Sequence, residues 1–170
     1  MVTNSEELLD INEVSSVEFK PKKEVLDQFR KKATPDEYSL IRDLYKTHSI
    51  SEEKRDLPGL LSTLTDDCEY LLLQSGHSWK GKAGAAKFYQ ELLTAFPDID
   101  FQLQNIVIGP QGVFQEASVT GTHRGSWLGT PASNKRYQWM TLILFPWDSE
   151  KRKFRGERVF STLAEEMSKD

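Results

Sequence analysis

The sequence has only one cysteine, Cys68, among its 170 residues, so the chain can form no internal disulfide. A single thiol fits a reducing compartment. Long hydrophobic runs are also missing: the longest, residues 142–147, is far shorter than the roughly 20 residues that cross a bilayer. The first residues are acidic and lack the basic start and apolar stretch of a signal peptide. We therefore expect a cytoplasmic protein without membrane contacts.

Excess positive charge is absent as well. The formal net charge is −4 and the pI is near 5.5, which argues against general nucleic-acid binding, because that needs a basic surface to neutralise phosphates. The three histidines, His48, His77 and His123, form no metal-ligand spacing, so we expect no metal and no cofactor. Residues 76–83 approach a phosphate-binding loop, but Ala83 stands where Ser or Thr would hold magnesium. A hairpin followed by a helix is the expectation there.

What remains is the composition of one globular domain, with 38% hydrophobic and 28% charged residues. We assign residues 1–33 to an N-terminal extension. Its basic stretch is interrupted by acids, which favours a short amphipathic helix over an arm for nucleic acid or membrane. The domain, residues 34–170, should begin at Thr34 as a helix N-cap, with Pro35 at the first helical position.

Hydrophobic periodicity then predicts helices first and strands later. The expected elements are helices from 35 and from 57 to about 64, a strand at 68–73, a helix at 83–96, and strands at 99–108, 113–123, 137–145 and 154–160. Consecutive strands after helices indicate an α+β fold with an antiparallel sheet. A long curved sheet wrapped on helices leaves room for a ligand pocket.

Three segments carry a family resemblance. They are GTHRGSWLGTPA at residues 121–132, the helix end with Phe88, Tyr89, Leu92 and Ala-Phe-Pro-Asp at 95–98, and Glu-Arg-Val-Phe at 157–160. In order and spacing the chain resembles the SnoaL-like polyketide cyclases of the nuclear transport factor 2-like superfamily. The resemblance implies a cone-shaped, curved antiparallel β-sheet wrapped on N-terminal helices and enclosing a pocket, also called cystatin-like.

The resemblance also implies where the cyclase site would lie. It places the catalytic aspartate of the last strand at Val159, the histidine that assists it near Met140, and a further aspartate at Thr162. Valine transfers no proton, and a methionine thioether is only a weak acceptor. The cyclase reaction is therefore not carried over with the resemblance.

Two other side chains are candidates for acid–base chemistry. Period-two alternation assigns His123 to the inner face of its strand, and an imidazole titrates near neutral pH. Glu157 shares the face of Val159, and burial can raise the pKa of a carboxyl. The alternatives are structural: His123 anchors its loop near Pro131, and Glu157 pairs with an arginine such as Arg136 or Arg155.

Aromatic and polar side chains should line the rest of the pocket, although core packing is the commoner role for each aromatic. The expected lining residues are Tyr45, Tyr70, His77, Trp79, Trp127, Gln138, Trp139, Met140 and Val159.

Three functions stay open at this point, because a fold alone does not decide function. The first is binding of a small hydrophobic molecule without catalysis. The second is an isomerase- or cyclase-type enzyme that acts on an enolisable or ring-containing molecule through His123 and Glu157. The third is a protein-interaction module that forms a homodimer through the outer face of the sheet, which exposure of Phe154 and Phe160 would support.

Overall fold

The computed structural model describes residues 22–169. Its helices are α1 (Lys22–Gln28), α2 (Pro35–Glu53), α3 (Leu57–Ser62), α4 (Gly81–Ala95) and α5 (Leu163–Met167). Its strands are β1 (Leu64–Leu72), β2 (Ser78–Lys80), β3 (Asp100–Gly109), β4 (Gly112–Thr122), β5 (Arg136–Asp148) and β6 (Lys153–Ser161). None of the helices in this described part is long and apolar enough to cross a membrane.

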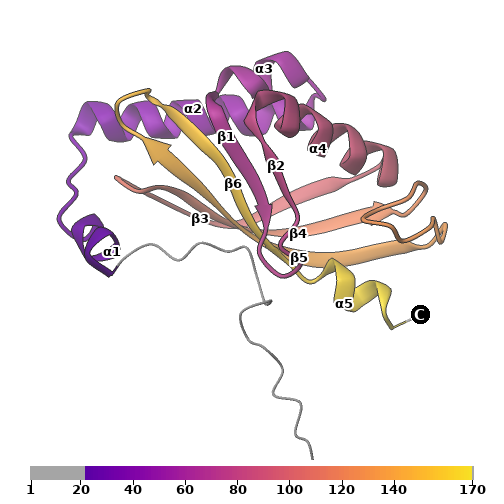
Figure 1. Cartoon of the computed structure of the whole chain (residues 1–170). Coiled ribbons are helices and arrows are strands. Elements are labelled where there is room, and N and C mark those ends of the chain that lie inside the picture. Colours follow the sequence, from indigo (N-terminus) through magenta and orange to yellow (C-terminus); the bar gives the residue numbers. More distant parts are fainter. Residues whose placement is uncertain (1–21, 170) are drawn as a thin grey trace, which may run out of the picture.

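The six strands form one curved, open sheet in the order β2-β1-β6-β5-β4-β3. Helices α2, α3 and α4 lie together on one side of the sheet (Figure 1). Neighbouring strands are antiparallel except β1 and β6, which run parallel. The α+β fold with a curved sheet is thus confirmed. The expectation of purely antiparallel pairing missed the β1–β6 pair, because strands so far apart in sequence leave no turn signal.

The helix boundaries follow their capping residues. Thr34 accepts a hydrogen bond from the Glu37 N–H at 3.1 Å, and Pro35 occupies the first turn, as predicted. Asp56 caps α3 in the same way through the Gly59 N–H. The segment that approaches a phosphate-binding loop is the β1–β2 hairpin followed by the start of α4. That expectation is confirmed.

The core lies between the helices and the facing side of the sheet. Along β5 every second residue is buried, so one face of this strand packs on the helices and the other faces outward. Its buried residues are Tyr137, Trp139, Thr141, Ile143, Phe145 and Trp147. Each large apolar side chain buried in this way stabilises the fold by about 1.5–3 kcal/mol.

The predicted N-terminal extension is described only in part, since residues 1–21 lie outside the described residues. Its described part contains the short helix α1, whose Leu26 is half-exposed and whose end is followed by the 84% exposed Phe29. The Gln111 amide donates to the Gln28 carbonyl at 2.8 Å, which ties α1 to the β3–β4 turn. The boundary after residue 33 stays a prediction.

Candidate functional site

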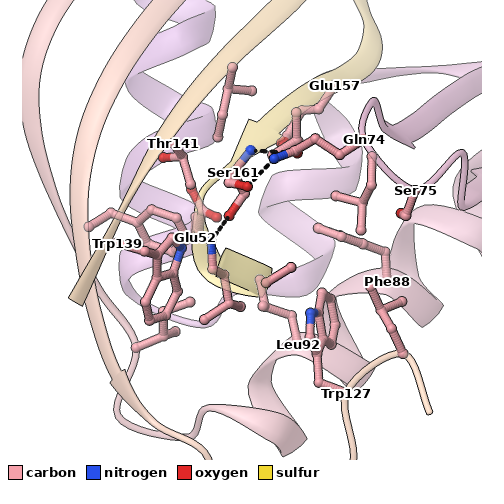
Figure 2. Close-up of a pocket in the computed structure, with 18 residues that line it drawn as sticks. Glu52, Gln74, Ser75, Phe88, Leu92, Trp127, Trp139, Thr141, Glu157 and Ser161 are labelled. Atoms are coloured by element: carbon pink, nitrogen blue, oxygen red, sulfur yellow. Dashed lines mark hydrogen bonds between the residues drawn. The ribbon is translucent and has the colours of Figure 1, made fainter. Parts of the chain in front are cut away.

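A pocket of about 120 Å³ opens between the sheet, α4 and the loop that follows β4. Figure 2 shows Trp139 on one side of the pocket and Phe88 and Trp127 on the other. Its lining residues are Glu52, Leu72, Gln74, Ser75, Phe88, Leu92, Ile99, Phe101, Trp127, Leu128, Trp139, Thr141, Ile143, Glu157, Val159, Ser161, Leu163 and Ala164. Most of these side chains are apolar, so the pocket favours an apolar ligand.

Of the described side chains that line the pocket, only Glu52 and Glu157 carry an ionisable group. Glu52 comes from the last turn of α2, and Glu157 comes from β6. Glu157 is 3% exposed. Two carboxyl groups in an apolar pocket are unusual, because burial of a carboxylate is costly unless it is paired.

A bulge next to Gly156 presents Glu157 to the pocket. Gly156 has a φ of +103°, and a Cβ there would lie 2.0 Å from the Glu69 carbonyl oxygen. Only glycine fits this close approach of β1 and β6. Glu157 and Val159, two residues apart, both face inward, as predicted.

Glu157 is hydrogen-bonded from two helices. The Tyr89 hydroxyl of α4 donates to Glu157 Oε1 at 2.8 Å, and His48 Nε2 of α2 lies 3.1 Å from the same oxygen. The prediction of an arginine partner is wrong for Arg136, which pairs with Asp98 at 2.9 Å. The partner is His48, which the sequence analysis considered only as a metal ligand, because no local pattern brings it to a residue 109 positions further along the chain.

The hydrogen bonds of His48 define its tautomer. Thr63 Oγ1 donates to the Leu60 carbonyl at 2.7 Å, so it can only accept from His48 Nδ1, also at 2.7 Å. Nδ1 therefore carries a proton. The contact between His48 Nε2 and Glu157 Oε1 then needs one further proton, held by either group, because two lone pairs would repel. His48 and Glu157 thus share a proton beside the pocket.

Glu52 is the second functional residue that the sequence analysis missed. Burial raises the pKa of Glu52 to about 8, and the nearby Glu157 charge adds to this rise, while Arg55 and Tyr89 oppose it. Glu52 is therefore mostly protonated at neutral pH. Its spacing of four residues from His48 was the available signal, since it puts both side chains on the same face of α2.

Tyr45 and Tyr70, two of the predicted pocket residues, lie buried beside the pocket without lining it. The Tyr45 hydroxyl donates to Gln115. The Tyr70 hydroxyl is buried and makes no hydrogen bond with the described residues. Burial, with Glu157 nearby, raises the pKa of Tyr70 and of Tyr89 well above the usual value. Both phenols are therefore neutral and can act only as hydrogen-bond partners.

His123, the other predicted catalytic residue, lies away from Glu157 and its hydrogen-bond partners. It is fully buried and stacked on Phe96, with ring centroids 5.1 Å apart, and it does not line the pocket. Its Nδ1 accepts from the Ser133 N–H at 3.4 Å, and its backbone bonds Lys135 and Asn134. Burial lowers the pKa of His123. These contacts are those of the loop-anchoring alternative, and a catalytic role for His123 stays a prediction.

The remaining predicted pocket residues fall into three groups. Trp127, Trp139 and Val159 line the pocket. His77 and Trp79 line a separate surface hollow on the other side of Trp127. Gln138 and Met140 alternate with the buried residues of β5 and so point to the outer face of the sheet.

Within residues 22–169, no three His, Cys, Asp or Glu side chains come together as ligands for a metal. The pocket of the described chain therefore offers hydrogen bonds and protons from two carboxyl groups. Those are the groups of general acid–base chemistry.

The fold defines a class: α+β proteins of the nuclear transport factor 2-like type, in which a curved, open sheet and helices border a pocket. The sequence profile of the family described as SnoaL-like polyketide cyclase matches residues 26–153. The chain belongs to this family. The match also reaches into the predicted extension, back to residue 26. No curated protein matches the chain in sequence.

Solved structures with the same fold carry several different descriptions. One is a proposed SnoaL-like polyketide cyclase from Jannaschia sp. CCS1, with TM-score 0.66 and 19% identity, covering 81% of this chain and 95% of that one. Another is AclR, a proposed hydroxylase from Streptomyces galilaeus, with TM-score 0.57, 20% identity, and 71% and 87% covered. A third is an LEH-like epoxide hydrolase from M. tuberculosis, with TM-score 0.58, 12% identity, and 76% and 88% covered. At these identities the likeness shows the fold alone.

Proposed function

We propose that this protein binds a small, largely apolar molecule in the pocket beneath Trp127. The observation that carries the proposal is an apolar cavity of about 120 Å³ in which, among the described residues, only Glu52 and Glu157 are ionisable lining groups. An engineered apolar cavity of about 150 Å³ holds a benzene molecule. The buried part of the ligand should therefore be about the size of one ring. One polar group on the ligand would meet the two carboxyls.

Membership of the SnoaL-like family does not by itself assign the polyketide cyclase reaction to this chain. Val159 occupies the position that the resemblance assigns to the catalytic aspartate, and it lines the pocket as an apolar side chain. Relatives in fold include a proposed hydroxylase and an epoxide hydrolase, so the same architecture accompanies different chemistries. Binding is the function that needs no further assumption.

A second candidate is an isomerase- or cyclase-type enzyme that acts on an enolisable or ring-containing molecule. Glu157 supports it, because this carboxyl lines the pocket and shares a proton with His48. His123 contributes to such a reaction only if its loop brings the imidazole to the ligand.

The binding proposal is tested with a set of monocyclic ketones and aromatic compounds, measured by thermal shift and by NMR of the tryptophan side chains. At least one compound should raise the Tm of the wild-type protein and of Glu157→Gln. Val159→Phe, which fills the pocket, should abolish the shift. Val25→Phe is the matched control, because Val25 is 46% exposed on α1 and does not line the pocket. Binding that survives Val159→Phe would contradict the proposal.

We also propose that the protein forms a homodimer through the outer face of the sheet. An apolar stripe crosses this face: Val107 pairs with Phe114 on β4, Phe114 with Leu144 on β5, and Phe160 of β6 pairs with Leu142. Val107, Phe114 and Phe160 are exposed, whereas Phe154 is fully buried in the core and gives no support. Val107→Lys should convert a dimer to a monomer in sedimentation equilibrium, and a wild-type monomer would contradict the proposal.

We also propose that the protein is cytoplasmic, because its single thiol fits a reducing compartment. The single thiol, Cys68, is free and buried in β1. Burial raises the pKa of Cys68 to about 11, so the thiol is unreactive and has no partner for a disulfide within the chain.

A further inference from the structure

We propose that Glu52 is the proton donor and Glu157 the proton acceptor of the pocket, acting on a small molecule with a carbonyl group next to a C–H bond. His48 is the positioning residue of Glu157. This inference rests on the proposed binding function and names the chemistry of the same site.

The two carboxyl groups have opposite surroundings. Glu157 Oε1 faces the Tyr89 hydroxyl and the proton shared with His48, and hydrogen bonds of this kind favour the charged form. Glu52 lies in the last turn of α2, where the partial negative charge of the helix end disfavours a carboxylate. Two titratable groups with such divergent environments define an acid and a base.

The geometry leaves one oxygen of Glu157 for a ligand. The contacts of Glu157 with Tyr89 and His48 both end on Oε1, so Oε2, with the Tyr70 hydroxyl near this carboxyl, is the oxygen that can accept a proton from the pocket. Glu52 also lines the pocket and is only partly buried, so its protonated carboxyl can reach a carbonyl oxygen there. The other polar lining side chains of the described chain offer hydroxyls, one amide and two indole N–H groups, none of which ionises near neutral pH.

The proposed step is balanced without a co-reactant. Glu157 Oε2 takes the proton from the carbon next to the carbonyl, and the C–H electron pair forms a new C=C bond. The carbonyl π electrons move to oxygen, which receives the proton of Glu52. The reverse movements return a proton from Glu157 to the same or a conjugated carbon and restore Glu52. The net result is exchange or migration of one hydrogen.

His48 acts on this step through Glu157. Thr63 holds the Nδ1–H of His48, so Nε2 points to Oε1 at 3.1 Å. The other titratable or charged groups that face the two carboxyls are Tyr45, Tyr70, Tyr89 and Arg55. The three phenols stay neutral, because burial raises their pKa values. The alkaline pH dependence of the step therefore comes from Glu52, whose pKa is raised to about 8.

The experiment uses the full chain and cyclohex-3-enone, a one-ring ketone whose isomerisation to the conjugated cyclohex-2-enone is followed by ultraviolet absorbance. Deuterium uptake from D₂O, read by NMR, reports proton removal even without migration. Wild-type protein should accelerate exchange over buffer. Glu157→Gln should lower this acceleration by about 100- to 10,000-fold, the range of general acid–base catalysis. Glu52→Gln should lower it less, because the glutamine amide can still donate a hydrogen bond to the carbonyl oxygen.

The matched control is Glu53→Gln, because Glu53 is the exposed neighbour of Glu52, and it should keep wild-type activity. The rate should fall as pH rises through about 8, where Glu52 loses its proton. This alkaline fall should disappear in Glu52→Gln. Circular dichroism and Tm confirm that each variant is folded.

The role of His48 is tested by two substitutions. His48→Gln keeps an N–H donor toward Glu157 and should retain most activity, whereas His48→Leu removes it. If His48 positions Glu157, His48→Leu lowers kcat with little change in KM, and His48→Gln restores most of the lost kcat. Equal activity in folded His48→Leu and His48→Gln would overturn this role.

Outcomes separate the two proposals. If the ketone binds by NMR and neither isomerisation nor deuterium exchange exceeds the rate in buffer, the acid–base inference is overturned and the binding proposal stands. If no member of the ketone and aromatic set binds, both fail. If exchange is unaffected by Glu52→Gln and Glu157→Gln, the reaction belongs to other groups, and the inference is again overturned.

Discussion

The two buried histidines of this protein differ in how visible they are in the sequence and in what they contact. His123 lies in the most recognisable segment of the chain, yet it is stacked on Phe96, and its buried Nε2 makes no well-formed hydrogen bond with the described residues. His48 lies in an ordinary amphipathic helix, yet both of its ring nitrogens are hydrogen-bonded, one of them to Glu157 at the pocket. A recognisable motif marks the family and a loop, whereas the neighbourhood of a side chain decides its chemistry.

The two histidines also differ in their charged neighbours. His123 has no carboxyl partner, and burial lowers its pKa, so it is a neutral ring that holds a loop. His48 faces a carboxyl and shares a proton with it. Removing each histidine should therefore change the free energy of unfolding and the stabilisation by a ligand to different extents, and the following measurements test this comparison.

The largest effect is expected for His48→Leu. It leaves the Glu157 carboxyl buried with one hydrogen bond fewer and no proton to share, and the loss of one partner of a buried pair costs about 3–5 kcal/mol. Urea unfolding at pH 7 measures this loss. The double variant with Glu157→Gln should recover part of it, because the uncompensated charge is gone. A loss below about 1 kcal/mol would contradict the assigned pairing.

A smaller effect, dependent on pH, is expected at Glu52. Its carboxyl has a pKa of about 8 in the folded protein against 4.5 ordinarily, so the folded state binds more protons between these values. The Glu52 contribution to stability is therefore fully present below pH 4.5 and is lost as pH rises through 8. The free energy of unfolding of wild type should therefore fall by about 2–3 kcal/mol more than that of Glu52→Gln between pH 6 and pH 9.

Urea midpoints at several pH values measure this difference. Glu53→Gln provides the control and should show the wild-type dependence. If the urea midpoints of wild type and Glu52→Gln differ by the same amount at every pH, Glu52 does not have a raised pKa in the folded protein.

The smallest effect is expected for His123→Leu. Leucine can pack on Phe96 and removes a buried nitrogen that makes no well-formed hydrogen bond with the described residues, so the free energy of unfolding should change by about 1 kcal/mol or less at pH 7.5. The lowered pKa of His123 makes wild-type stability fall as pH drops through 6.5, and the variant should lose this part of the fall.

Ligand stabilisation should also survive in His123→Leu. Calorimetric scans with and without a bound monocyclic compound check this point. Loss of the ligand effect in a folded His123→Leu protein would place His123 in the site and reverse the comparison.

Much of the fold was predictable because it is encoded locally. Thr34 and Pro35 mark the start of α2, and period-two alternation assigns Glu157 and Val159 to the inner face. The parallel pairing of β1 with β6 was missed, since no local signal records which distant strands become neighbours. Within the site, Glu157, Trp127, Trp139 and Val159 were predicted to face the pocket. Gln138 and Met140 point to the outer face, because they alternate with the buried residues of β5.

The sequence by itself determined the elements, their caps, the family and the inward face of the last strand, because each depends on spacing within a few residues or on a motif. Only the tertiary structure decided that His48 and Glu52 of α2 meet Glu157 of β6, residues more than a hundred positions apart. That meeting depends on how α2 packs across the sheet and on the close approach of strands at Gly156. Packing of this kind is set by the whole core and leaves no pattern in any one segment.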